Sequence, residues 1–242
     1  MPWLETAIPA VPLATTMVAR PRGTGRAGRF LLEIRASQYG PMDGDTTSRP
    51  ASTPIDRVIQ LKIVYWGPAE AGKTTSLLAI ADIFQRFRLD EIIVVQTTGG
   101  RTLWNEYCAF QFTIPAGAGT AAQVVVHLSS LTGQERFLAT REFAGSSIDG
   151  AIFVADCRPE YLAATRRSYE ELVAFAPRGT PVIVQANFQD VPAAARPAAI
   201  DQLLGSFAKG TYAKVVPTVA TRGTNVAAAF LDLLHAVLTR RT

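Results

Sequence analysis

The clearest chemical signal in the sequence is a phosphate-binding pattern. The segment Gly67-Pro-Ala-Glu-Ala-Gly72-Lys73-Thr74 fits G-x-x-x-x-G-K-S/T, a loop whose backbone N–H groups turn towards a phosphate. An apolar β-branched run enters it and an apolar helical pattern leaves it, so the loop is expected at a helix N-terminus, where the dipole favours negative charge. A chance glycine turn before a helix is the alternative. The predicted phosphate-binding residues are Gly67, Pro68, Ala69, Glu70, Ala71, Gly72, Lys73, Thr74 and Thr75.

Two side chains of this loop supply its expected charge and metal contacts. The Lys73 ammonium is expected to reach the β- and γ-phosphates of a nucleotide, and the Thr74 hydroxyl to bind Mg²⁺. Kinases, ATPases and GTPases share the loop, so it identifies neither the base nor the reaction.

The segment 97–102 is polar and glycine-rich. In it Thr102, with Thr98 as second choice, is expected to close over the γ-phosphate and Mg²⁺ as a switch; an ordinary strand-entry loop is the alternative.

A further segment bears on nucleotide hydrolysis. Ras-like GTPases carry D-x-x-G-Q after a buried strand, and this chain has Ser130-Leu-Thr-Gly133-Gln134 in that place. The comparison implies that Gly133 senses the γ-phosphate and that Gln134 orients the attacking water; a solvated residue at a helix start is the alternative for Gln134. Ser130 can hydrogen-bond a water on Mg²⁺ but brings no charge, so this replacement bears on metal affinity.

Two later loops are candidates for reading the base. The segment Asn187-Phe-Gln-Asp190 stands where guanine-binding proteins carry N-K-x-D. The Asp190 carboxylate can accept hydrogen bonds from guanine N1–H and N2–H₂, which adenine lacks, while Asn187 would tie the loop to the phosphate loop and the base. Phe188 replaces the lysine that covers one base face; its ring either stacks there or packs as a strand-end core residue. The loop 219–223 supplies the other predicted base-binding residues, Ala220 and Thr221.

These loops need a scaffold that brings them to one edge, and the hydrophobic pattern predicts it. Short apolar runs alternate with helical periodicity, which indicates βα units and an α/β fold with a three-layer, doubly wound, mostly parallel sheet of the P-loop type. Strands are predicted over 58–66, 102–114, 123–129, 150–156, 181–187 and 212–219. Helices are predicted over 72–87, 135–146, 161–175, 198–207 and 225–240.

The composition sets the domain limits and the function classes. The chain has 242 residues, 48% of them hydrophobic, enough for one sizeable core, expected in residues 56–242. Residues 1–55 are rich in Pro, Gly, Arg, Ser and Thr and are expected to form a largely disordered extension. A net charge of +4 gives little support for nucleic-acid binding, and no apolar run is long enough for a membrane helix. Cys108 and Cys157 lie in apolar runs and are expected as buried, reduced thiols, which favours a cytoplasmic protein.

Together these segments resemble the small Ras-like GTPases, and most closely the bacterial MglA-type polarity GTPases of gliding and twitching bacteria. The resemblance covers residues 59–237. The segments that match the family are residues 62–67 with the following Gly72-Lys73-Thr74-Thr75, the segment Arg101-Thr102-Leu103, and residues 127–134 and 153–156. That family also has a hydroxyl residue at the position of Ser130.

The resemblance implies a function and partners. It implies a GTP- and GDP-binding switch in polarity or motility-type regulation, with Mg²⁺ at Thr74, Thr102 and Ser130, which hydrolyses GTP slowly unless a partner assists. Arg101 is implied as an in-chain arginine finger, which neutralises developing charge and is worth on the order of 10³–10⁵ in rate; a solvated loop cation is the alternative. The implied partners are a roadblock/longin-type activating protein and effector proteins.

Two other functions stay open. Ser130 and Phe188 favour a nucleotide-dependent binding module with little or no hydrolysis. A P-loop ATPase or small-molecule kinase would need an acidic residue on an adjacent strand, for which Asp156 is the candidate. Asp156 is otherwise expected to cap the following helix.

Overall fold

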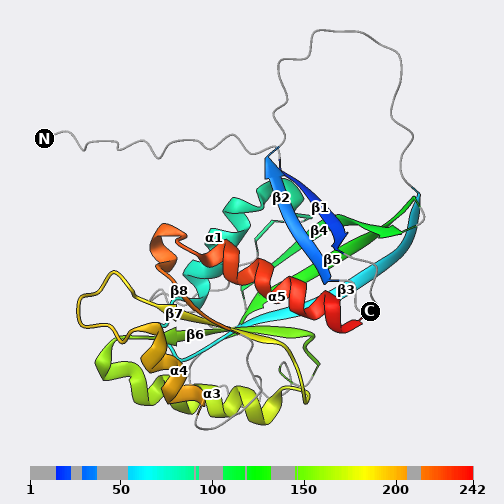
Figure 1. Ribbon diagram of the computed structural model, residues 1–242. Helices are drawn as coiled ribbons and strands as arrows, with labels where there is room; N and C mark the ends of the chain where they lie inside the picture. Colours follow the sequence, from blue (N-terminus) through cyan, green and yellow to red (C-terminus); the bar gives the residue numbers. More distant parts are fainter. Residues whose placement is uncertain are drawn as a thin grey trace, which may run out of the picture.

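A six-stranded sheet with the order β4-β5-β3-β6-β7-β8 forms the centre of the molecule (Figure 1). The computed structural model describes residues 15–22, 29–36, 54–89, 91–92, 106–117, 119–131, 145, 147–205 and 214–241. Neighbouring strands of this sheet run parallel, except for the antiparallel pair of β4 and β5 at one edge. The strands are β3 (Ile55–Trp66), β4 (Glu106–Gly117), β5 (Thr120–Ser130), β6 (Gly150–Asp156), β7 (Val182–Asn187) and β8 (Lys214–Pro217).

Helices cover both faces of the sheet and confirm the predicted three-layer α/β fold. Helices α1 (Lys73–Ile83) and α5 (Val226–Arg241) lie on one face, and α3 (Leu162–Phe175) and α4 (Pro197–Gly205) on the other (Figure 1). The described residues also form the short 3₁₀ turns η1 (Gln85–Phe87), η3 (Pro159–Tyr161) and η4 (Ala220–Arg222). The predicted helix over 135–146 lies almost wholly outside the described residues. Within the described part of the chain, no helix is long and apolar enough to cross a membrane.

The burial of each strand follows from its place in the sheet. Every residue of β6 and β7 is buried, because helices cover both faces at the centre, and this explains why these strands read as continuous apolar runs. In β5 buried and half-buried residues alternate, since successive side chains point to opposite faces and one face packs less tightly. The interiors of these strands are therefore mainly apolar, and the polar residues of the predicted site lie in the loops at the strand ends.

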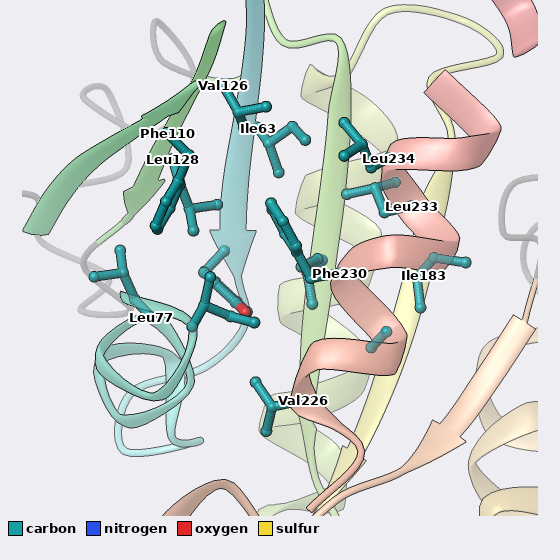
Figure 2. Packing of buried hydrophobic residues seen from close by; sticks show 14 of the residues in the cluster. Ile63, Leu77, Phe110, Val126, Leu128, Ile183, Val226, Phe230, Leu233 and Leu234 are labelled. Carbon is teal, nitrogen blue, oxygen red and sulfur yellow. The ribbon is translucent and has the colours of Figure 1, made fainter. Parts of the chain in front are cut away.

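The larger core cluster fills the space between the sheet, α1 and α5. Figure 2 shows the Phe230 side chain of α5 directed at the sheet, near Ile63 and the side chains of β4 and β5. Its ring centroid lies 5.6 Å from that of Phe84 and 6.2 Å from that of Phe110. A second cluster packs α3 and α4 against the other face, where the Trp66 indole N–H donates to the carbonyl oxygen of Ser168 at 3.0 Å.

Two further strands lie in the N-terminal stretch. Strands β1 (Thr15–Arg22) and β2 (Arg29–Ala36) pair antiparallel in a separate two-stranded sheet. The short apolar patch 30–34 lies in β2. Most of the remaining residues among 1–55 lie outside the described ones, so the predicted extension over 1–55 stays a prediction.

The packing of α5 predicts a large loss of stability on truncation of Phe230. Replacing Phe230 with alanine leaves a cavity between Phe84 and Phe110, so Phe230→Ala is expected to lower the free energy of unfolding by about 3–5 kcal/mol in urea titration. Leu78→Ala is the control, because the Leu78 side chain on α1 is 40% exposed and its loss should cost less than about 1 kcal/mol. Equal effects of the two variants would contradict the described packing of α5.

Candidate functional site

The loop between β3 and α1 requires glycine at two positions. Gly67 has φ 147°, and a Cβ there would lie 2.3 Å from the Val154 carbonyl oxygen. Gly72 has φ 98°, and its Cβ would lie 2.4 Å from Asn187 Nδ2. Both contacts are too short for any side chain, so these glycines let the loop approach the ends of β6 and β7.

The backbone of this loop and Lys73 bring positive polarisation to the start of α1. Glu70 has φ 63°, a left-handed conformation of the kind that occurs in anion-binding turns of the backbone. The residue Lys73 is only 7% exposed, and its ammonium donates to the carbonyl oxygens of Gly67 at 3.0 Å and Pro68 at 2.6 Å. The lysine therefore lies across its own loop, beside the N-terminus of α1, where an anion would bind.

Asn187 joins the loops that follow β3, β7 and β8. Its Nδ2 donates to the carbonyl oxygen of Ala71 at 2.9 Å, and its Oδ1 accepts the backbone N–H of Ala220 at 3.0 Å. The Thr218 hydroxyl also approaches Oδ1, at 3.5 Å. The structure thus brings Asn187 to the phosphate-binding loop, as the sequence predicts; its contact with a base stays a prediction.

The remaining predicted base-binding residues surround Asn187. Phe188 follows it, and Asp190 lies two residues further along, with its side chain 31% exposed and Oδ2 4.0 Å from Arg222 Nη2. Ala220 and Thr221 lie in η4. The backbone N–H of Ala220 donates to Asn187 Oδ1, so this hydrogen bond joins the loop after β7 to the loop after β8.

A carboxylate that the sequence analysis missed lies beside Thr74. The Thr74 hydroxyl donates to Glu106 Oε1 at 2.7 Å, and Glu106 is fully buried at the start of β4. Glu106 is paired directly with Ser130 of β5, so both side chains lie on one face of the sheet. The available signal was an acidic residue that opens an otherwise apolar strand shortly after Thr102.

This group of oxygens fits a metal that is completed by phosphates. Across the part of the chain that the structure describes, no set of three or more His, Cys, Asp or Glu side chains could hold a metal ion. Mg²⁺ is commonly held by one or two carboxylates together with substrate phosphates and waters. Thr74, Glu106 and Ser130 match that requirement, with one carboxylate and two hydroxyls at the phosphate-binding loop.

Asp156 does not fill the acidic role considered for it. It lies at the end of β6, fully buried, and its carboxylate accepts from the Arg158 backbone N–H at 3.1 Å, Nε at 3.0 Å and Nη2 at 2.7 Å. These bonds stabilise the turn before η3. The N-cap residues of η3 and α3 are Arg158 and Tyr161, and neither helix has a side-chain cap hydrogen bond, so the expectation that Asp156 caps the following helix is wrong. The bonded carboxylate raises the pKa of the Arg158 guanidinium, which stays charged.

Both cysteines are buried and free. Burial raises the pKa of the Cys108 and Cys157 thiols from 9.0 to about 12, with a smaller opposing effect of Arg88 on Cys108 and of Gln189 on Cys157. The burial of both thiols and their raised pKa values favour the protonated form and give no support to a nucleophilic role for either cysteine.

Several predicted site residues lie outside the described residues. They are Arg101, Thr102, Gly133 and Gln134, together with the second choice Thr98. Their roles stay predictions.

Known proteins similar to this chain are small GTPases. The chain is 30% identical over 168 residues to the mutual gliding-motility protein MglA of Myxococcus xanthus, across 67% of this chain and 84% of MglA. It is 28% identical over 195 residues to the ADP-ribosylation factor-like protein 4C of Homo sapiens and of Mus musculus, across 78% of this chain and 93% of each relative. No protein-family model matches the chain.

The contacts of Asn187 predict that it stabilises the site even without a ligand. Asn187→Ala leaves the buried Ala71 carbonyl and Ala220 N–H without their partner, so the free energy of unfolding in urea should fall by about 2–4 kcal/mol. Gln189→Ala is the control from the same loop, because the Gln189 amide donates to the nearby Ala195 carbonyl oxygen at 3.0 Å, and the loss of this bond should cost about 1 kcal/mol. A loss for Asn187→Ala no larger than for Gln189→Ala would argue against the bridge.

Proposed function

Because the chain belongs to the small Ras-like GTPases of the MglA type, we propose that this GTP-binding switch holds its nucleotide with Mg²⁺ and hydrolyses GTP slowly. The observation that carries the proposal is the Asn187 bridge, which unites the phosphate-binding loop with the two loops proposed to read the base. A nucleotide with its phosphates at α1 and its base near Asp190 would span this bridge.

The phosphate end of the proposed site is positively polarised and carries one acid. Lys73 would balance charge on the β- and γ-phosphates, and the N–H groups of the loop would donate to their oxygens. Thr74, Glu106 and Ser130, with the predicted Thr102, would hold Mg²⁺, which neutralises charge on the phosphates during transfer. Glu106 supports this assignment because it supplies the negative charge that Ser130 lacks.

The base end is proposed to select guanine. Asp190 offers a carboxylate, an acceptor for the N1–H and N2–H₂ donors that guanine has and adenine lacks. Asn187 and Ala220 would border the same base. The Asp190 carboxylate lies next to the loop 219–223, because its Oδ2 is 4.0 Å from Arg222 Nη2.

Hydrolysis is proposed to depend on residues of the switch segments and on a partner. Gln134 would orient the attacking water, and Arg101 would act as an in-chain arginine finger once a roadblock/longin-type activating protein binds. Effector proteins would read the GTP-ordered surface in the cytoplasm, in polarity or motility-type regulation. MglA-type family membership supports this scheme.

Single-turnover hydrolysis tests the proposal. The full chain with Mg²⁺ should release phosphate from GTP on the order of 10⁻³ s⁻¹ or more slowly, and not from ATP. Lys73→Ala removes charge that stabilises the phosphoryl group, so phosphate release should fall by about 10²-fold or more. Lys214→Ala is the matched control, because Lys214 pairs with Asp232 on the surface, and it should leave the rate unchanged.

The other outcomes select other functions. GTP binding without turnover, even with an activating protein, would indicate a nucleotide-dependent binding module. Faster turnover of ATP than of GTP would overturn the guanine assignment.

The proposed magnesium role of Glu106 predicts a specific rescue. Glu106→Gln retains an oxygen for Thr74 but loses the charge, so the Mg²⁺ concentration that half-maximally slows GDP release should rise by about 10–100-fold. Adding Ser130→Asp to Glu106→Gln returns a carboxylate to the paired position on β5 and should restore most of the Mg²⁺ sensitivity. If Glu106→Gln leaves the Mg²⁺ dependence unchanged, Glu106 is a structural partner of Thr74 only.

A further inference from the structure

The Arg158 guanidinium lies between two aromatic rings next to the proposed base-binding loop. Its Cζ lies 4.2 Å from the ring centroid of Tyr161 and 4.2 Å from that of Phe188. Both distances are within the range of attractive cation–π contacts. Tyr161, Arg158 and Phe188 therefore form a stack in that order, which links the turn after β6 to the loop after β7.

Asp156 fixes the guanidinium in this stack. Its two carboxylate oxygens accept from Arg158 Nε at 3.0 Å and Nη2 at 2.7 Å, a bidentate contact that sets the plane of the guanidinium as well as its position. Asp156 is fully buried, so the acid itself is held by the end of β6. Lysine has no planar fork and could not reproduce this geometry.

The Phe188 ring lies where a planar ligand could reach it. Phe188 directly follows Asn187, whose side chain bonds Ala71 of the phosphate-binding loop, and it is half-buried. Its backbone has φ 65°, a conformation costly for a bulky residue, so the contacts of the side chain must help to hold it. With the guanidinium over the ring, Phe188 is fixed at the rim of the proposed nucleotide site.

We propose that Arg158 is a positioning residue for the nucleotide base, which holds the Phe188 ring as a platform on which the purine stacks. This inference rests on the proposed nucleotide-binding function and adds to it the face-on recognition of the base. The layers are then Tyr161, Arg158, Phe188 and the purine. Asp190 reads the edge of the base, while Phe188 reads its π face, which hydrogen bonds cannot do.

The Arg158 guanidinium also explains how the loop after β7 could bind a base without a lysine after Asn187. Arg158 brings a positive charge to this loop from the neighbouring strand end, and Asp156 balances it. An aromatic ring buries a flat surface against a base at low cost in side-chain entropy, provided the ring is held in one orientation. The stack provides that restraint.

GDP affinity of the full chain in Mg²⁺ tests the inference through a double-mutant cycle. Phe188→Leu removes the platform and should weaken GDP binding by about tenfold, the scale of one base–aromatic stack. Arg158→Lys keeps a positive charge beside Asp156 but loses the flat, bidentate geometry, and should weaken binding by about fivefold to tenfold. The double variant should bind within about twofold of Phe188→Leu alone, because Arg158 acts through the ring.

Two further variants serve as controls. Phe188→Tyr keeps the aromatic face and should bind GDP within about twofold of the original chain. Arg166→Lys changes an arginine of α3 that pairs with Glu170 on the surface of the helix, and should leave the affinity unchanged. Without GDP, the unfolding temperature of Arg158→Lys should stay within about 4 °C of the original.

The outcomes separate the inference from the proposed function. If the original chain binds GDP and Arg158→Lys binds it equally well, or if the two losses multiply in the double variant, the positioning role is wrong and the nucleotide-binding function stands. If the original chain binds no GDP, both are wrong.

Discussion

The bridge that Asn187 makes between three loops is the constraint on which the rest of the site depends. It requires β3, β7 and β8 to end at the same edge of the sheet, which the parallel register provides. It also requires Gly72, because any Cβ there would occupy the space of the Asn187 amide. The Asn187 side chain thus joins the phosphate-binding loop to the loop 219–223, which we propose to border the base.

The second constraint is the balance of charge around the phosphate-binding loop. A loop that concentrates N–H groups and Lys73 attracts phosphates, but a divalent metal needs an acid nearby. Ser130 provides none, and Glu106, across the antiparallel pair of β4 and β5, is the acid that we propose for this role. In the loop that we propose to bind the base, Phe188 carries no charge, and Arg158 brings one from the end of β6. In both parts of the proposed site, the charge comes from a neighbour in space and not from the predicted motif.

Local sequence patterns predicted the scaffold well, because apolar runs and helical periodicity report directly on burial. All six predicted strands of the central sheet are present, and the glycine pattern located the loop at the start of α1. Glu106 and Arg158 were missed for a common physical reason: their partners are set by strand register and by packing between loops, which short-range patterns do not encode. Asp156 illustrates the same limit, because the sequence predicted a helix cap, whereas its carboxylate pairs with Arg158, a contact that depends on side-chain conformation. The switch residues Thr102 and Gln134 lie outside the described residues, so their assignment rests on sequence and family membership.

The central claim is that these loops form one site for a guanine nucleotide. Calorimetric titration of the full chain with GDP and then with ADP, both in Mg²⁺, tests it most directly. The account predicts one binding site per chain for GDP and no detectable heat of binding for ADP at the same concentrations. Equal affinity for the two nucleotides, or binding of ADP alone, would contradict it.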